Sequence, residues 1–219
     1  MPLTHRKPRP LSRDQHTFRD DRLFIIACDD TYAPKQYFDF FRLPRIQVHV
    51  VPTTDGTSNA QAVLDRLLEY EHQEHDERWL LLDTDHCTRG PHIKPFLAAL
   101  QMARQHGVHV ALSNPCFELW LLLHHVSETE VGGLADCAAV DARLSDVLGG
   151  YNKTRLVAEH YPLTSIFEAC ARARRLKDSA GGGDIPSSNA TLVFQIWQSL
   201  CGKALPSQLP RELRDLVLR

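Results

Sequence analysis

The feature that most constrains the fold is a strongly apolar run, residues 79–82 (WLLL), that stops at Asp83-Thr84-Asp85. Such a run is typical of a central strand in a parallel sheet, where helices cover both faces. Side chains at i and i+2 on a strand point to the same side, about 7 Å apart. Ligands of open α/β sheets bind where strands end, and paired carboxylates repel each other without a cation. Asp83 and Asp85 therefore predict a site for a hard cation such as Mg²⁺. The alternative is that both are solvated turn residues that cap the next helix.

Strand and helix patterns alternate through the first half of the chain. Short apolar or alternating runs predict strands at residues 23–27, 46–51, 79–82 and 108–112. Apolar residues at helical spacing predict a helix after each strand, at residues 34–43, 59–71, 93–105 and 116–124. Ser58 is available to cap the second helix, and Asn114-Pro115 to open the fourth. The alternation predicts an α/β fold with a mostly parallel sheet of about four strands flanked by helices.

Acidic and polar residues follow three of the predicted strands. Right-handed crossovers place the ends of parallel strands on one edge of the sheet. Asp29 and Asp30 are therefore expected near Asp83 and Asp85, with the Ser113-Asn114 turn beside them. A carboxylate cluster of this kind can hold one or two divalent ions that activate water and stabilise the leaving oxygen of a phosphodiester.

Glu118 lies in the first turn of an otherwise apolar segment. A carboxylate among apolar neighbours is costly unless it is paired, metal-bound or at the rim, which favours a place in the site. The alternative is that it faces the positive end of the helix dipole. The chain contains no P-loop, no G-x-G-x-x-G after the first strand and no G-x-S-x-G elbow. The residues alone leave metal-dependent phosphoryl chemistry or a non-catalytic α/β module.

The second half of the sequence has no strand pattern. Helices are expected at residues 134–148, 153–160, 163–177 and 190–200, separated by glycine and proline. The predicted organisation is a basic N-terminal arm at residues 1–22, an α/β core at 23–128 and an all-helical extension at 129–219 packed on the core. The arm can grip phosphates or be a solvated tail. The basic stripe of Arg172, Arg174, Arg175 and Lys177 predicts either a nucleic-acid or partner contact or a solvated helix face.

Composition narrows the cellular setting. The six cysteines form no C-x-x-C pair, which favours a reducing, cytoplasmic compartment over a disulfide framework or a zinc ribbon. No apolar run is long enough to span a bilayer and no signal peptide is seen, so no membrane contact is expected. The net charge of -2 means that any nucleic-acid contact must come from local patches.

Several segments together resemble the RloB-like family. The most specific is the block at residues 113–124, SNPCFELWLLLH. Asp83-Thr84-Asp85-His86 and the Tyr37-Phe38 pair also fit, as do the segments at residues 151–153 (YNK) and 185–189 (IPSSN). The resemblance covers the chain from about residue 22 to residue 200.

RloB-like proteins are similar to the Toprim nucleases of bacterial abortive-infection and antiphage systems. The resemblance implies a Toprim-type α/β core, Mg²⁺ or Mn²⁺, and cleavage of nucleic acid, either RNA such as tRNA or DNA. It also implies an ABC- or AAA-type ATPase partner that restrains or triggers the nuclease, and it leaves homo-oligomerisation open.

The resemblance also assigns roles to residues. Asp83 and Asp85 match the Toprim acidic pair, and Glu118 matches the glutamate of the block, as a ligand or general base. Asp29 stands at the first acidic position, one methylene shorter than the family's usual glutamate. Asp30 and Pro34 replace the glycine and the later glutamate of that motif. The resulting sets of residues are catalytic Asp29, Asp83, Asp85 and Glu118, metal-binding Asp29, Asp83 and Asp85, and substrate-binding Lys153, Asn114 and His86.

Three hypotheses about function follow. The first is a Mg²⁺-dependent Toprim-like nuclease, the effector of an antiphage system. The second is a catalytically degenerate relative that binds nucleic acid or an ATPase partner without cleaving. The third is a metal-dependent enzyme that acts on a small phosphorylated substrate.

Overall fold

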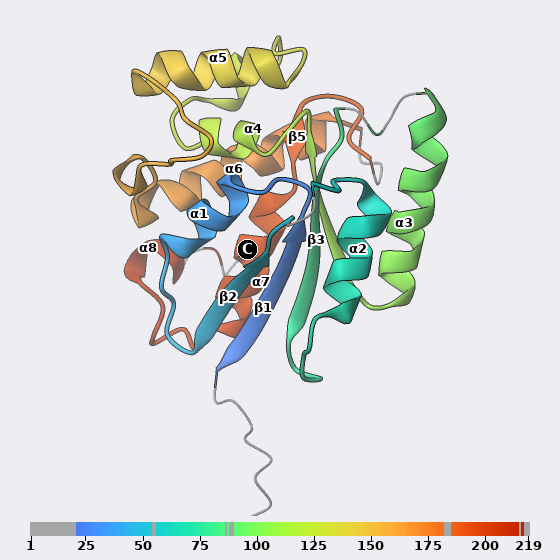
Figure 1. Ribbon diagram of the computed structural model, residues 1–219. Helices are drawn as coiled ribbons and strands as arrows, with labels where there is room; N and C mark the ends of the chain where they lie inside the picture. Colours follow the sequence, from blue (N-terminus) through green and yellow to red (C-terminus); the bar gives the residue numbers. More distant parts are fainter. Residues whose placement is uncertain are drawn as a thin grey trace, which may run out of the picture.

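The computed structural model describes residues 21–53, 56–85, 87, 90–181, 185–214 and 216. His86 and nearly all of the predicted N-terminal arm lie outside these ranges. The described chain forms one five-stranded sheet in the order β2-β1-β3-β4-β5 (Figure 1). Its strands are β1 (Arg22–Cys28), β2 (Ile46–Val51), β3 (Glu77–Asp83), β4 (His109–Asn114) and β5 (Ala190–Thr191).

Four strands of the sheet are parallel, as predicted for an α/β fold. β1 lies between β2 and β3, and β3 lies between β1 and β4. The side chains of β1 from Leu23 to Cys28 are all buried, because helices cover both faces. The short β5 pairs antiparallel with β4, with Ser113 opposite Thr191. The sequence predicted a helix from residue 190 and not β5, since two residues are too few to show an alternating pattern.

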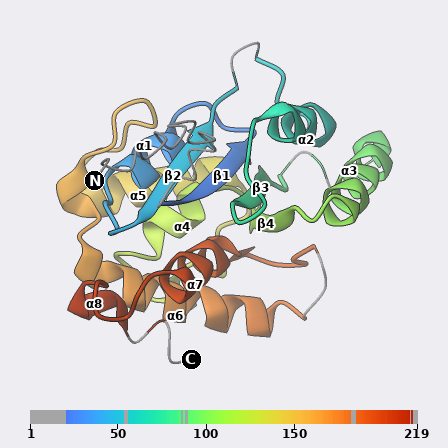
Figure 2. The same cartoon turned by 90° about the horizontal axis from the view of Figure 1, so that it is seen from below.

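Helices cover the sheet in two layers (Figures 1 and 2). On one face lie α2 (Ala60–Glu69) and α3 (Ile93–Gln105). The other face is covered by α1 (Ala33–Asp39), α4 (Glu118–Leu122) and α7 (Val193–Lys203). Outside this second layer lie α5 (Cys137–Leu148), α6 (Leu163–Ser179) and α8 (Arg211–Arg214). Short 3₁₀ helices occur at Gly90–His92, Glu128–Glu130 and Ala158–His160.

Two predicted helix boundaries are corrected by the structure. Asn59, not Ser58, caps α2, because its side chain accepts a hydrogen bond from the Ala62 amide at 3.0 Å. Asn114-Pro115 does not open α4, which begins at Glu118, and the Asn114–Pro115 peptide bond is cis. Asn114 instead uses its side-chain amide to hold another segment, as described below.

The helix predicted at residues 153–160 is absent from the described chain, apart from the 3₁₀ turn at Ala158–His160. Gln36 on α1 explains the difference. Its side-chain amide donates to the Lys153 carbonyl at 3.0 Å, and its carbonyl accepts from the Leu156 amide at 2.9 Å. These bonds hold the segment, which turns at residues 152–155, against α1, so two of its backbone groups are paired without forming a helix.

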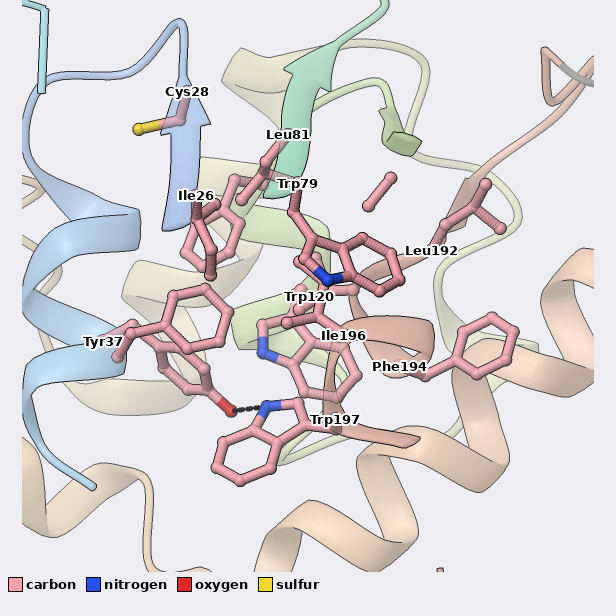
Figure 3. Close-up of a cluster of buried hydrophobic side chains, with 14 of the residues drawn as sticks. Ile26, Cys28, Tyr37, Trp79, Leu81, Trp120, Leu192, Phe194, Ile196 and Trp197 are labelled. Carbon is pink, nitrogen blue, oxygen red and sulfur yellow. Dashed lines mark hydrogen bonds between the residues drawn. The ribbon is translucent and has the colours of Figure 1, made fainter. Parts of the chain in front are cut away.

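An aromatic cluster joins the second helical layer to the sheet. Tyr37 of α1 is fully buried at its centre (Figure 3). Ring contacts connect it to Phe38, Phe41, Phe117, Trp120, His124, Tyr161 and Trp197. Edge-to-face pairs of this kind stabilise a core beyond their buried area. The cluster therefore fastens α1, α4 and α7 together under the strands.

Four polar side chains in and beside the aromatic cluster are joined in a chain of hydrogen bonds. Trp197 Nε1 donates to the Tyr37 hydroxyl at 3.1 Å, and that hydroxyl lies 3.1 Å from His124 Nε2 (Figure 3 shows the first bond). His124 Nδ1 lies 2.6 Å from Ser165 Oγ, which donates to the Pro162 carbonyl at 2.8 Å. Burial lowers the pKa of His124 to about 3, so the ring is neutral. This series of hydrogen-bonded side chains therefore carries no charge.

The basic stripe on α6 is engaged within the chain. Arg172 donates to the Leu123 carbonyl at 2.8 Å, and the Arg174 guanidinium lies 5.9 Å from the centroid of the Phe194 ring. Arg175 forms a two-pronged ion pair with Glu128. Three of the four cations in the basic stripe therefore have a structural role. Within the described part of the chain, no helix has both the length and the apolarity needed to cross a membrane.

Candidate functional site

Two of the predicted site aspartates lie together where β1 and β3 end. Asp29 directly follows β1, and Asp83 is the last residue of β3. The two strands are parallel neighbours in the sheet, with Cys28 opposite Leu81. Asp29 Oδ2 accepts a hydrogen bond from the Asp83 backbone amide at 3.0 Å. With Asp85, which follows two residues later, they form what we call the carboxylate edge (Asp29, Asp83 and Asp85).

Charges at the carboxylate edge repel one another in a buried setting. Burial, reinforced by the charges of Asp30 and Asp85, raises the pKa of Asp29 to about 7. Burial also raises the pKa of Asp83 well above its ordinary value, with further increases from Asp29 and Glu118. Near neutral pH the edge therefore favours a bound proton or a cation.

Lys153 forms what we call the lysine bridge with two buried carboxylates. Its ammonium nitrogen lies 2.8 Å from Asp30 Oδ2 and 3.5 Å from Glu118 Oε1. The side chains of both acids are at most 3 % exposed. Although burial alone would lower the pKa of Lys153, the charges of Glu118 and Asp30 raise it above its ordinary value, so the bridge is ionic.

Tyr151 completes the surroundings of Glu118. Its hydroxyl donates to Glu118 Oε1 at 3.0 Å, so the same oxygen meets a hydroxyl and an ammonium. Tyr151 and Lys153 come from one loop, which Gln36 holds against α1. Glu118 was predicted as a metal ligand or general base, and Lys153 as a phosphate contact. In the structure these two groups form an ion pair with each other.

The remaining predicted site residues have different surroundings. Asp85 Oδ2 accepts a hydrogen bond from the Cys137 thiol at 3.2 Å. The side-chain amide of Asn114 donates to the Pro186 carbonyl at 2.9 Å and to the Ser188 carbonyl at 3.2 Å. Asn114 therefore fastens the segment that leads into β5. His86, predicted to bind substrate, lies outside the described residues.

Two cavities open on either side of Asp85. The first has a volume of about 250 Å³ and lies between the carboxylate edge and the first turns of α2 and α3. It is lined by Asp29, Ser58, Asn59, Ala60, Gln61, Asp85, Cys87, His92, Pro95 and Phe96. The second has a volume of about 470 Å³. It is lined by Thr84, Asp85, Ile93, Asn114, Pro115, Ala135, Asp136, Ile185, Pro186 and Ser187. Glu118 and Lys153 line neither of these two cavities.

The carboxylate edge suits a hard cation in donor type and charge. Among the residues that the structure describes, no three His, Cys, Asp or Glu side chains are gathered so that they alone could hold a metal ion. Mg²⁺ does not need such a cage, since it commonly binds one or two carboxylates together with water and substrate phosphate oxygens. Asp29 and Asp83, with their raised pKa values, supply carboxylates whose repulsion an ion would relieve. The residues present therefore fit Mg²⁺ or Mn²⁺ bound jointly with a phosphate.

Sequence reasoning missed some contacts and residues of the site. It places Asp30 near this edge but not its contacts: the side chain pairs with Lys153 and accepts a hydrogen bond from the Tyr32 amide at 2.7 Å. Asp141 on α5 interacts electrostatically with the lysine bridge, because burial and then the charge of Glu118 raise its pKa to about 6. Cys137 reaches Asp85 from the start of the same helix. Neither α5 residue stands in a pattern that would have revealed it.

The segments that carry the family resemblance meet in space. Asn114 of the block at residues 113–124 bonds to the segment at 185–189, and Glu118 bonds to Tyr151. His124, at the end of the block, bonds to Tyr37. The resemblance thus reflects one connected set of contacts around α4.

Comparison with known proteins gives one result. No curated protein and no solved structure matches the chain. A family model described as RloB-like protein matches residues 24–200, most of the sequence. The chain therefore belongs to the RloB-like family.

Proposed function

We propose that this protein is a metal-dependent nuclease of the Toprim type, which cleaves phosphodiester bonds in RNA or DNA. The observation that carries the proposal is the carboxylate edge, where half-buried acidic groups at the ends of β1 and β3 meet beside two cavities. Such an edge, at the carboxyl ends of parallel strands, is where α/β proteins bind ligands. Membership of the RloB-like family supports the same function.

In this proposal each acidic group has a defined task. Asp29, Asp83 and Asp85 hold Mg²⁺ or Mn²⁺, together with a phosphate oxygen of the substrate. The bound ion supplies activation of water and stabilisation of the leaving oxygen. Asp29 stays in place through its bond from the Asp83 amide. Glu118 and Lys153 act as positioning residues, because their charges neutralise each other behind the edge.

One observation favours a second function, binding without cleavage. Asp30 and Glu118, two of the acids nearest the carboxylate edge, are already paired with Lys153. A protein with its acids neutralised internally has fewer left for ions. In that case the protein would bind nucleic acid or its ATPase partner as a degenerate subunit.

The proposed biological role is that of an effector in bacterial antiphage defence, restrained or triggered by an ABC- or AAA-type ATPase. This role rests on the family alone. Co-expression tests it directly: toxicity of the nuclease should change when an ABC- or AAA-type ATPase of the same defence system is produced with it. Toxicity that no ATPase alters would contradict the partnership.

The decisive experiment incubates the purified protein with total RNA or plasmid DNA in Mg²⁺, Mn²⁺ or a chelator. Cleavage is expected with either metal and should cease with the chelator. Asp83→Ala should lower the rate at least about a hundredfold. Asp146→Ala, an exposed acid on α5, is the matched control and should cleave normally. Equal activity of both variants would refute the nuclease, and turnover of free nucleotides without cleavage of polymers would favour an enzyme of small phosphorylated substrates.

A further inference from the structure

The two cavities beside Asp85 suggest what kind of substrate the site receives. They share Asp85 as a common wall. The first turn of α3 stands between them, because Ile93 lines the larger cavity while Pro95 and Phe96 line the smaller one. A ligand that fills both must therefore cross over Asp85.

We propose that the cavities seat consecutive nucleotides of an unpaired strand, with the linking phosphate over the carboxylate edge. This inference rests on the proposed function and names its substrate class, single-stranded nucleic acid or an unpaired loop. A strand fits because its repeating unit alternates a bulky base with a narrow, charged linker. The site has the same alternation of recess, acidic wall and recess.

A duplex does not match this shape. Its bases are paired and turned towards the helix axis, so they cannot enter recesses while the phosphates stay at the edge. Unpaired bases can be splayed apart and seated individually, which is how proteins usually recognise single-stranded nucleic acid. The exposed ring of His92, in the smaller cavity, is suited to stack on a base.

The charge of the site predicts how binding depends on metal. A phosphate placed over Asp85 meets three aspartates, so the polymer is repelled until a divalent ion is bound. Exposed Lys94, between Ile93 and Pro95 on α3, is one nearby cation. We therefore expect divalent ions to strengthen the binding of a single strand, although simple salts weaken most nucleic-acid complexes.

The test measures binding by fluorescence anisotropy, with Ca²⁺ in place of Mg²⁺ to slow cleavage. The probes are a short unstructured RNA, the DNA of the same sequence and a blunt duplex of each. Ala135→Trp places an indole at the larger cavity and Ser58→Trp at the smaller one. Ala138→Trp, at an exposed position on α5 that lines neither cavity, is the control. Circular dichroism checks that each variant folds.

The expected result is binding of the single strands that needs Ca²⁺, is weakened about tenfold by each cavity-filling variant and is unchanged in the control. Comparing the RNA and DNA strands shows which sugar the site prefers. Equal or tighter binding of the duplexes would overturn the inference, as would normal binding by folded cavity-filling variants. Ca²⁺-dependent single-strand binding by a protein that never cleaves would contradict the nuclease and still support the seat for a strand.

Discussion

Two buried polar clusters in this molecule differ in how their groups are balanced. Around Tyr37, a hydroxyl, an indole, a neutral imidazole and a serine form a closed chain of hydrogen bonds without charge. At the carboxylate edge, the half-buried Asp29 and Asp83 adjoin each other and their pKa values are raised. The four groups of the first cluster bond to one another, whereas the acids of the carboxylate edge repel one another.

The difference distinguishes a cluster that stabilises the fold from a cluster that is suited to binding or catalysis. Polar groups that are buried and fully paired fix one arrangement of a core. Buried like charges cost stability, and proteins retain such costs mainly at functional sites. The lysine bridge lies between the two cases, because its charges are buried but opposite. Substitutions in the three places should therefore have different signs and sizes.

The largest effect is expected from Tyr37→Ala. It removes a fully buried ring and the acceptor of Trp197, so unfolding in denaturant should show a loss of about 4 kcal/mol. Tyr37→Phe should lose only about 1 kcal/mol, since the ring remains and one hydrogen bond is lost. Tyr32→Ala, half exposed at the start of α1, is the control and should change little. A loss from Tyr37→Ala no greater than that of the control would show that the aromatic cluster does not hold the layers together.

Lys153→Met should have the next largest effect. It leaves Asp30 and Glu118 buried without their cation and should cost about 3 kcal/mol, the low end for breaking a buried pair, because Lys153 itself reaches solvent. The control is Lys35→Met, which breaks an exposed pair with Asp39 and should cost at most about 0.5 kcal/mol. Equal losses in the two variants would mean that the lysine bridge behaves like a surface pair.

A smaller effect should appear in the pH dependence of the metal-free protein. The pKa of Asp29 is raised from 3.8 to about 7, so the folded state holds its proton more tightly than the unfolded state. The stability that this proton contributes is complete below about pH 4 and is lost as the pH rises through about 7. Asp29→Asn should remove about 2 kcal/mol of that decline in unfolding experiments between these values. If Asp29→Asn left the pH profile unchanged, the pKa of Asp29 would not be raised in the folded protein.

The smallest effect is the stabilisation by Mg²⁺ at neutral pH. An ion that binds only the folded state should add about 1.4 kcal/mol at ten times its dissociation constant. Thermal unfolding should show this gain above pH 7 and little of it near pH 5, where Asp29 is protonated. Asp83→Asn should abolish the gain. The same gain in that variant would place the ion elsewhere.

The sequence predicted the parallel part of the sheet well for a simple reason. Buried parallel strands must be apolar throughout, so the runs at β1 and β3 stand out from their surroundings. Helix α3 was also predicted with its observed bounds, because its apolar residues recur at helical spacing. What failed were segments whose conformation depends on distant partners. The loop that contains Lys153 takes its conformation from its hydrogen bonds to Gln36, and β5 forms only by pairing with β4.

The candidate site shows the same limit. Asp83 and Asp29 could be placed near each other from topology, since adjacent parallel strands end on the same edge. The engagement of Glu118 by Tyr151 and Lys153 could not, because the sequence predicted a helix from residue 153, and the observed loop depends on its bonds to distant Gln36. Asp141 was invisible for a similar reason: one acid among the polar positions of a helix carries no signal of what it faces.

Binding of a divalent ion at the carboxylate edge can be measured by isothermal titration calorimetry, with Mn²⁺ titrated into the metal-free protein at neutral pH. Saturable binding is expected for the wild type and for Asp146→Ala, and none for folded Asp83→Ala. Absence of binding in the wild type, or binding that Asp83→Ala leaves unchanged, would contradict a metal site at this edge.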